Sequence, residues 1–293
     1  MKKYLMLVTL FLIIFLQTSC IIKDDLEPKG DILTAEEIQE LTADYIEYTD
    51  KNKNKIKDFD QWYKIDYLYE TNHKIKYEPS GTSVNIGYSI IKISGKLYES
   101  AILYNTRADL DVEMTTYVYK HSKEQYYKMN LKCKLVNGIA YYKMNYKYEK
   151  KENSEVVKKE KDTVKFYGEL EDFYKIIDIN QSLYDLTSTN QIFSSILANF
   201  NTPSNENTNQ HLMKDNNTYC YIDYNSHLSR IEFKLNKDYT TNKIKMYSTS
   251  SNRQDSTYVK IEKCLGKVII KPINHNKYIS YDDVEFIKIE LDV

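Results

Sequence analysis

The chain has 293 residues, and its 41 basic and 42 acidic residues leave a formal net charge of −1. This length is enough for one large domain, or two smaller ones, with a sizeable core. The balance of charges argues against a nucleic-acid binder, which would gather Lys and Arg in basic patches. The chain has only 7 glycines, and it lacks both G-x-S-x-G and a glycine pattern that could cradle phosphate. The sequence therefore contains no signature of the common hydrolases or nucleotide-binding proteins.

The first twenty residues have the layout of a secretory signal. Lys2 and Lys3 give a positive start, residues 4–16 are apolar apart from Thr9, and small residues then lead into Cys20. A short basic segment, an apolar run and a small-residue cleavage site are the three parts of such a signal. The segment resembles the signal of bacterial lipoproteins, in which the cysteine becomes the new N-terminus and carries the lipid.

This resemblance implies a signal peptide over residues 1–19, lipidation at Cys20 and a tether over residues 20–32. Gln17 departs from the family pattern, which usually has a branched aliphatic residue three positions before the cysteine. Cleavage would leave 274 residues with 39 basic and 42 acidic side chains. No later apolar run approaches the roughly 18 residues of a membrane span. The resemblance therefore implies a cell-envelope protein held by lipid alone, on the outer side of the cytoplasmic membrane or in the outer membrane.

A helix is predicted directly after the tether, from Thr34 to about Tyr48. Thr34 and Glu37 have the spacing of a capping box, and Leu33 and Ile38 have the spacing of a hydrophobic staple. The apolar residues that share one face of this helix are Ile38, Leu41 and Tyr45. We expect this face to pack on a sheet.

A meander of antiparallel strands is predicted from Val84 onward, with a turn at Ser94-Gly95 and a hairpin at Asn137-Gly138. Asn-Gly is the strongest short hairpin signal, and a two-residue loop fixes which residues face each other. The predicted pairs on the apolar face are Leu135 with Ala140, Cys133 with Tyr142, Leu131 with Met144, Met129 with Tyr146, and Tyr127 with Tyr148. A second turn near Ser122-Lys123 adds residues 110–118, among them Met114, to the same face.

On the opposite face of this sheet, three acidic side chains follow one strand. Asp109, Asp111 and Glu113 point the same way and could form a metal site or an acid/base pair. The predicted register sets Asp111 opposite Lys134 and Glu113 opposite Lys132. Ion pairing on a solvated surface is therefore the preferred interpretation.

The rest of the chain alternates between helical and extended patterns. The sequence predicts a charged loop over 149–162, a short strand over 163–167, an amphipathic helix from Glu169 to about Leu186 and a further turn or two over 191–200. An Asn-rich loop or linker is predicted over 201–217. The later predicted strands cover residues 218–224, 229–235, 243–248, 257–264, 267–271 and 284–293.

The residues that most often carry chemistry form no recognisable site. The calcium-like start at Asp50, Asn52 and Asn54 lacks the required Gly and Glu further on. The five histidines are scattered, so no metal or cofactor is predicted. Besides Cys20, three cysteines remain and at most one intrachain disulfide can form; whether Cys220 and Cys264 pair stays open. Cys133, the third, should lie on the apolar face as a small hydrophobe.

Aromatic residues and methionines on the apolar face are the remaining candidates for function. Buried Tyr hydroxyls need polar partners, so several of them on one face indicate either a wet cavity or a polar lid. Flexible methionines beside them suit an amphipathic ligand. The candidate ligand-binding residues are Tyr127, Tyr142, Tyr146, Tyr148, Met114, Met129 and Met144. The alternative is that these residues only fill a packed core.

Together these patterns predict an α+β fold. We expect a large antiparallel sheet, a meander that can curve into a half-barrel, with two or three helices packed on one face. Residues 33–293 would form a single domain with a sub-boundary at 201–217. The plan resembles the half-barrels of lipoprotein carriers and lipid-binding envelope proteins, in architecture only. It favours a non-enzymatic lipoprotein that binds a hydrophobic or amphipathic, lipid-like ligand. The alternative is a surface or structural lipoprotein with a filled core that binds an envelope protein.

Overall fold

The computed structural model describes residues 30–53, 62–77, 84–100, 107–120, 122–177, 186–200, 209–224, 228–237, 239–264, 268 and 271–286. Its strands form one sheet of 13 strands in the order β1-β8-β9-β10-β11-β12-β2-β3-β4-β5-β6-β7-β13. Neighbours in this sheet run antiparallel except β13, which runs parallel to β7. The predicted α+β class with a large antiparallel sheet is therefore confirmed. Residues 1–29, with the predicted signal, Cys20 and most of the tether, lie outside the described part.

The first seven strands are β1 (Asp31–Ile32), β2 (Trp62–Tyr77), β3 (Val84–Ser100), β4 (Arg107–Lys120), β5 (Lys123–Val136), β6 (Ile139–Glu152) and β7 (Glu155–Gly168). The others are β8 (Gln210–Asp215), β9 (Thr218–Asp223), β10 (Leu228–Leu235), β11 (Thr241–Thr249), β12 (Arg253–Lys263) and β13 (Ile279–Ser280). The helices are α2 (Ala35–Lys53), α3 (Leu170–Ile177) and α4 (Leu186–Phe200), with short 3-10 helices η2 (His275–Lys277) and η3 (Tyr281–Asp283).

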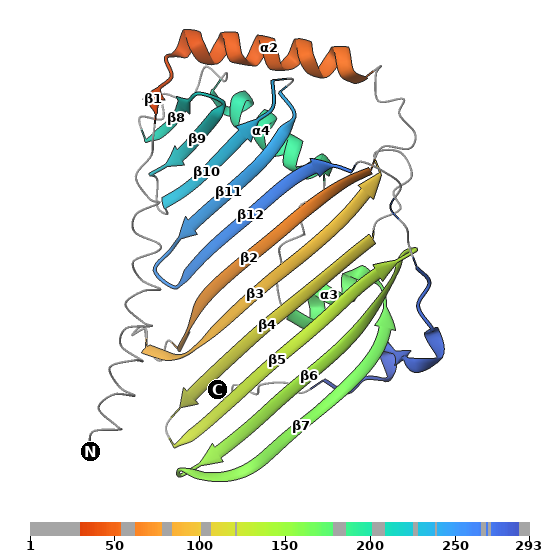
Figure 1. Cartoon of the computed structure of the whole chain (residues 1–293). Helices are drawn as coiled ribbons and strands as arrows, with labels where there is room; N and C mark the ends of the chain where they lie inside the picture. The colour runs from red at the N-terminus through yellow and green to blue at the C-terminus, as the bar shows by residue number, and fades with distance from the viewer. Residues whose placement is uncertain are drawn as a thin grey trace, which may run out of the picture.

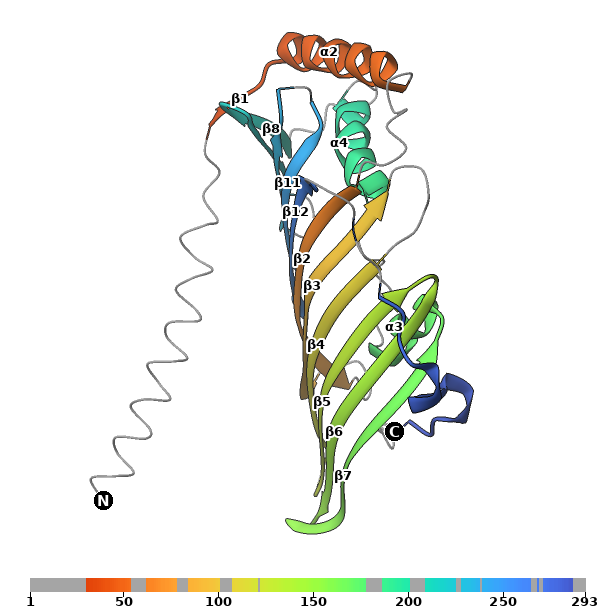
Figure 2. The ribbon, with the colours of Figure 1, turned by 45° about the vertical axis from the view of Figure 1, so that its right-hand side comes forward.

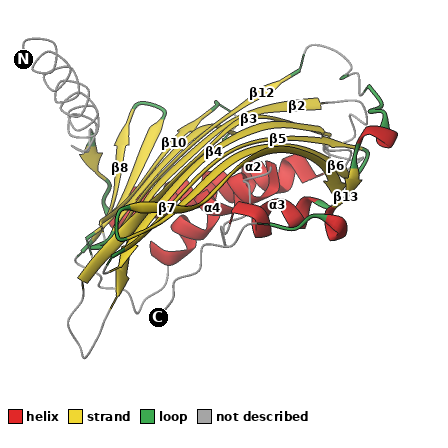
Figure 3. Cartoon of the chain, turned by 90° about the horizontal axis from the view of Figure 1, so that it is seen from below, coloured by secondary structure: helices red, strands yellow, loops and turns green. Residues whose placement is uncertain are grey.

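The sheet is open and curved, and the helices lie on one side of it (Figures 1 and 2). α4 lies behind β10 to β12, α3 lies behind the β4 to β6 region, and α2 crosses the end of the sheet beside β8 to β11 (Figure 1). Seen along another axis, all three helices sit under the concave side of the curve (Figure 3). We call the helix-covered face of the sheet the inner face and the opposite face the outer face. No described helix is long and apolar enough to cross a membrane.

The predicted start of α2 is confirmed in detail. The backbone N–H of Thr34 donates to Glu37 Oε2 at 2.8 Å, and the N–H of Glu37 donates to Thr34 Oγ1 at 3.2 Å. This reciprocal pair satisfies two of the N–H groups that a helix start leaves without intrahelical partners. Ile38, Leu41 and Tyr45 are buried, as the helical spacing predicts. The helix runs to Lys53, five residues further than predicted.

The hairpin at Asn137-Gly138 is confirmed together with every predicted pair. Both residues have positive φ, 53° and 80°, as the tight hairpin turn requires. The β4–β5 register, in contrast, was predicted wrongly by two residues. Asp109 lies opposite Lys134, and Asp111 lies opposite Lys132. The error leaves every residue on its predicted face, because a shift of two preserves the alternation of a strand.

The predicted turn at Ser94-Gly95 is wrong, because β3 runs straight through it. Gly95 serves a close approach between strands: a Cβ added there would lie 2.2 Å from the carbonyl oxygen of Asp109. Its φ of 154° also lies in a region that side chains disfavour. Gly95 therefore allows the backbone of the neighbouring strand to come close, and it does not reverse the chain.

The predicted loop over 149–162 is also wrong. Residues in it complete β6 and begin β7, joined by a two-residue turn at Asn153 (φ 51°) and Ser154 (φ 69°). Residues 155–163 of β7 are exposed on both faces of the sheet, apart from the half-buried Glu160. A strand that buries neither face needs no alternation of apolar and polar residues, so its pattern resembles that of a loop.

Strand β2 was not predicted, and it joins the two halves of the chain. It pairs with β3 on one side and with β12 on the other, for example Tyr69 with Ile93 and with Thr257. Strand β8 was likewise missed, since it lies within the predicted loop over 201–217. Asp31 and Ile32, at the end of the predicted tether, pair with β8 as β1. One sheet therefore runs through all the described strands.

The remaining helical and C-terminal predictions are partly right. The predicted helix from Glu169 is α3, which ends at Ile177 in the described part, and the helix predicted over 191–200 begins earlier, at Leu186. The predicted strand over 267–271 lies largely outside the described residues. In the predicted strand over 284–293, residues 284–286 are irregular and the others lie outside the described part.

Candidate ligand-binding face

The structure brings all seven candidate residues together on the inner face of β4, β5 and β6. Met114 faces Met129, which faces Tyr146 in the same row across the three strands. Tyr127 faces Tyr148 in the next row. These residues form or adjoin one core cluster with the inward side chains of α3 and α4. Within that cluster the seven residues have different environments.

Tyr142 is a core residue beneath the start of α3. Its side chain has 0% exposure, its ring stacks on Phe166 with centroids 4.8 Å apart, and its hydroxyl donates to the carbonyl oxygen of Glu169 at 2.7 Å. Burial raises the pKa of the hydroxyl well above its ordinary value. The polar lid over Tyr142 is therefore the backbone of the chain just before α3.

Tyr148, Met129 and Met144 are also enclosed. The Tyr148 hydroxyl donates to Gln125 Oε1 at 3.2 Å, and both side chains are buried. Met129 and Met144 are 1% and 2% exposed. These residues have the packing and the hydrogen bonding that a filled core requires.

Tyr146 and Met114 form the accessible part of the candidate set, beside the buried Tyr127. The rings of Tyr127 and Tyr146 stack with centroids 6.4 Å apart. Tyr127 is buried, whereas Tyr146 and Met114 are half-buried. The candidate site is therefore smaller than the sequence suggested and centres on these three side chains.

A set of partly exposed apolar side chains lies on the inner face in two groups, one on β10 and β11 and one on β4, β6 and β7, with buried residues of β12, β2 and β3 between the groups. Its members lie on the inner face and pack against the core cluster without being sealed by the described residues. They are Ile231 in β10, Met246 in β11, Met114 in β4, Tyr146 in β6 and Val164 in β7. We call these five residues the inner strip.

A polar network lies on the inner face where β12 meets β2. The Arg253 guanidinium donates through Nε to Asp255 at 2.9 Å and through Nη2 to the Tyr69 hydroxyl at 2.8 Å. The Tyr69 hydroxyl donates to Asp255 Oδ1 at 3.3 Å. Burial, followed by the negative charge of Asp255, raises the pKa of Tyr69. This network has no signal in the sequence, because Tyr69 and Arg253 are 184 residues apart and only the β2–β12 pairing joins them.

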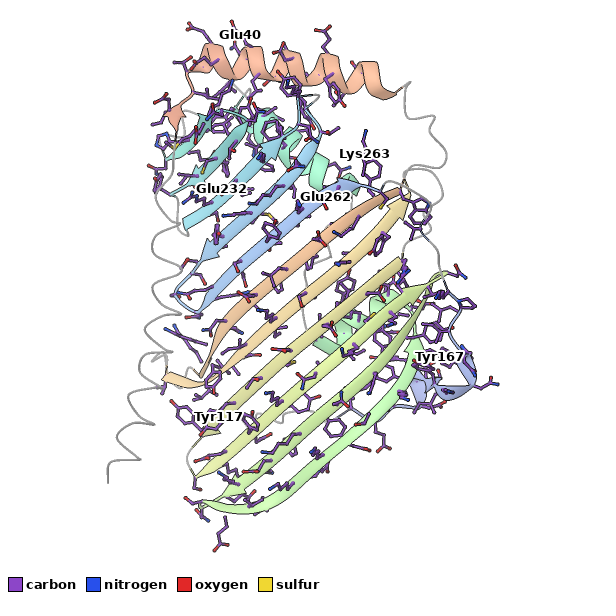
Figure 4. All side chains as sticks on the ribbon, viewed as in Figure 1. Glu40, Tyr117, Tyr167, Glu232, Glu262 and Lys263 are labelled. Carbon is purple, nitrogen blue, oxygen red and sulfur yellow. The ribbon has the colours of Figure 1, made fainter. Side chains whose placement is uncertain are left out.

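Two members of the acidic row on the outer face, Asp109 and Asp111, form ion pairs, as the preferred interpretation predicts. Lys132 Nζ lies 3.1 Å from Asp111, and Asp109 lies 2.9 Å from Arg107 and 3.8 Å from Lys134. The outer face carries other charges of both signs, including Glu232 and Glu262, whose side chains lie on the near side of the sheet in Figure 4. Among the described residues, no group of His, Cys, Asp and Glu is arranged to hold a metal ion.

The buried cysteines are thiols of low reactivity. Cys133 is fully buried on the inner face, and burial raises its pKa to about 12. Cys220 is a free buried thiol, so it forms no disulfide with Cys264. Because the thiolate is the reactive form, neither Cys133 nor Cys220 has the environment of a catalytic nucleophile.

The titration of Tyr127 gives a direct check on the enclosure of the site. Burial raises its pKa from 10.0 to about 12, so between these values the unfolded chain loses a proton that the folded chain keeps. Folding stability should therefore fall as the pH rises through this window. We expect the Tyr127→Phe variant to lose stability less steeply than the wild type there, as measured by denaturant unfolding at stepped pH. Equal slopes for the two proteins would show that Tyr127 is open to water.

No family model matches the chain, and no curated protein matches it in sequence. Among solved structures, the chain is similar to a β-barrel-like protein of the domain of unknown function DUF1849 from Brucella abortus. The sequence identity is 10%, the TM-score is 0.21, and the match covers 69% of this chain and 97% of that chain. A similarity this low carries no argument about the fold or the site.

Proposed function

We propose that the protein is a non-enzymatic lipoprotein of the cell envelope that holds a hydrophobic or amphipathic ligand on the inner face of its sheet. The membrane anchor in this proposal is a lipid on Cys20, for which the N-terminal sequence is the support. The observation that carries the ligand-binding part is the inner strip, in which the half-buried Met114 and Tyr146 share a helix-covered face with Tyr127, the stacking partner of Tyr146.

The chemistry of the inner strip favours an apolar ligand chain. Met adapts to irregular shapes because it is unbranched and polarizable. Tyr offers an apolar ring together with a hydroxyl that can meet a polar group. Small-molecule sites are typically apolar concave surfaces with a few polar groups, and the inner strip with the polar network at β12 has both parts.

We propose no enzymatic role because the side chains that could carry chemistry, the acidic residues of β4 and the Cys133 thiol, lie outside the inner strip. Asp109 and Asp111 of β4 form ion pairs on the outer face, away from the inner strip. The Cys133 thiol has a raised pKa and lies inside the core. Neither is placed to act on a ligand at Met114 or Tyr146.

The proposal is tested by placing a charge on the inner strip. We expect Met114→Glu to weaken binding of a fluorescent anthroyloxy fatty acid to the purified full chain at least tenfold, because the carboxylate would face the acyl chain. Thr115→Glu is the matched control, since Thr115 is the next residue of β4 and points to the outer face. It should bind the probe like the wild type. Thermal unfolding confirms that both variants fold.

The alternative function is a surface interaction protein, and one observation favours it. β13 pairs only with Phe166 and Tyr167 of β7, so residues 155–165 have no partner strand on that side among the described residues. Val156 and Val157 are exposed there. However, Lys and Glu side chains fill most of this edge, and charged edges generally prevent strand addition. If the wild-type chain binds no probe, the interaction function becomes the better explanation.

A further inference from the structure

We propose that the outer face of β5, β6 and β7 binds an acidic polysaccharide. The site consists of six lysines, which we call the lysine face, and of a cluster of tyrosines beside them. This inference concerns the side of the sheet opposite the inner strip and does not need a ligand there. The lysine face is made of Lys128 and Lys132 in β5, Lys143 and Lys147 in β6, and Lys161 and Lys165 in β7.

The lysine face is built from two rows in which lysines lie opposite lysines. Each row crosses the three strands, and all six side chains are exposed. Like charges directly opposite each other on neighbouring strands destabilise a sheet. An anion bound along either row would remove this repulsion. The rows are Lys132, Lys143 and Lys165, and Lys128, Lys147 and Lys161.

The protein itself neutralises only part of this charge. Lys132 lies 3.1 Å from Asp111, and Lys147 lies 3.9 Å from Glu149. The other four lysines make no ion pair within the described part of the chain. Because the whole chain has a formal net charge of only −1, the lysine face is a local concentration of positive charge. Such a surface attracts polyanions.

Uncharged polar side chains lie between the two rows of lysines. Asn130 faces Asn145, which faces Thr163. The Thr163 hydroxyl donates to Asn145 Oδ1 at 2.9 Å. Amide and hydroxyl groups can donate to and accept from the hydroxyls of a sugar. The lysine rows are four residues apart along each strand, about 13 Å. A sugar between them would therefore meet polar groups in the middle and ammonium groups on both sides.

A cluster of tyrosines adjoins the lysine face on the same side of the sheet. Lys147 Nζ lies 5.5 Å from the ring centroid of Tyr126, and Tyr126 faces Tyr117 of β4. The ring centroid of Tyr117 is 5.8 Å from those of Tyr88 and Tyr119. Tyr88 and Tyr119 are 39% and 43% exposed, and Tyr117 lies on the near side of the sheet in Figure 4. Such rings offer an apolar surface to the face of a sugar ring and a hydroxyl to its edge.

The shape of this surface favours a polysaccharide over an anionic bilayer. The outer face is the convex side of the curved sheet, since the helices lie under the concave side (Figure 3). A convex surface brings few of its lysines to a flat bilayer at once. Binding at a membrane surface also draws on the burial of apolar side chains, whereas Asn and Thr lie between the lysine rows.

The location of the protein favours a polysaccharide over a single-stranded nucleic acid. Both are polyanions, and nucleic-acid bases also stack on aromatic rings. A lipid-anchored protein of the cell envelope meets polysaccharides outside the cytoplasm. This choice of polymer rests on the proposed function, whereas the charge and the aromatic surface do not.

The experiment titrates polygalacturonate, a polymer of sugar carboxylates, into the full chain in a neutral detergent. We expect the affinity to fall about tenfold when sodium chloride is raised from about 50 to 300 mM, because salt screens exposed charges. The methyl-esterified polymer keeps the sugar rings and loses the charge, so it should bind about tenfold more weakly. Polyglutamate of equal charge keeps the carboxylates and lacks the rings, so it should also bind more weakly.

Lys143→Glu separates binding from folding. The new carboxylate would face Lys132 and Lys165, so thermal unfolding should show no loss of stability. Its affinity for polygalacturonate should fall about tenfold, because a negative charge would then lie in the binding surface. Lys237→Glu is the matched control, since it makes the same change of net charge at an exposed residue between β10 and β11. It should bind polygalacturonate like the wild type.

Equal weakening by Lys143→Glu and Lys237→Glu would overturn the inference, because net charge alone would then govern binding. Polyglutamate that binds as tightly as polygalacturonate would also overturn it. If Lys143→Glu instead weakens binding to oligothymidylate or to phosphatidylglycerol vesicles and leaves polygalacturonate binding unchanged, the face belongs to a nucleic acid or a membrane. None of these results involves the fluorescent fatty acid, whose failure to bind would refute only the proposed function.

Discussion

Replacing Phe193 by alanine is expected to lower the free energy of unfolding by about 3–5 kcal/mol. Phe193 lies in α4, has 0% exposure and contacts aromatic rings from three other elements. Its ring centroid is 5.3 Å from that of Tyr45 in α2, 5.5 Å from that of Tyr219 in β9 and 5.2 Å from that of Phe233 in β10. Truncation would leave a cavity where two helices meet the sheet.

Chemical denaturation with far-ultraviolet circular dichroism measures this loss, and Ser195→Ala is the control. Ser195 is an exposed residue of the same helix, so its substitution should change stability by less than about 0.5 kcal/mol. Hydrogen exchange should also become faster in α2, because Tyr45 packs on Phe193. A loss below about 1 kcal/mol in Phe193→Ala would mean that α4 is not docked on the sheet as described.

The parts of the fold that the sequence predicts correctly are those with local signals. The capping box at Thr34 and the two-residue turn at Asn137-Gly138 each act within a few residues, so their geometry follows from the sequence alone. Alternation on β5 and β6 similarly fixes which side chains reach the core. These signals predict faces and hairpins correctly even where a register is wrong by two, as for Asp111 and Lys132.

The parts that the sequence does not predict depend on contacts between distant segments. The first strand of the meander, β2, has no short turn to announce its pairing with β12, which follows almost 200 residues later. Residues 155–163 of β7 show no alternation of apolar and polar side chains, because neither face of the strand is buried there. The prediction of a turn at Gly95 is wrong because the close approach of Gly95 to β4 follows only from the pairing of the two strands.

The difference between local signals and contacts of distant segments also explains which features of the candidate site could be predicted. The seven aromatic and methionine residues fall on the predicted face, because that depends only on alternation. Which of them are sealed depends on α3 and on Gln125, which no periodic pattern connects to the tyrosines. The pairing of Arg253 with Tyr69 arises from the β2–β12 contact and has no local signal.

Substitutions at Tyr142 separate its role in the core from a role in the site. We expect Tyr142→Ala to lower the free energy of unfolding by about 3–5 kcal/mol, because the stacked ring is lost. Tyr142→Phe keeps the ring and removes only the hydrogen bond to Glu169, so the loss should be about 1 kcal/mol. Thermal and denaturant unfolding of the two variants measure the difference.

Ligand binding by Tyr142→Phe then decides how far the site extends. The Tyr142 hydroxyl already donates to the backbone before α3, so it is not available to a ligand. We expect Tyr142→Phe to bind the fluorescent fatty acid like the wild type, whereas Tyr146→Phe, at a half-buried position, can change the affinity. If Tyr142→Phe instead weakens binding while unfolding normally, then α3 must lift from the sheet when the ligand enters. The site would then include the core beneath that helix.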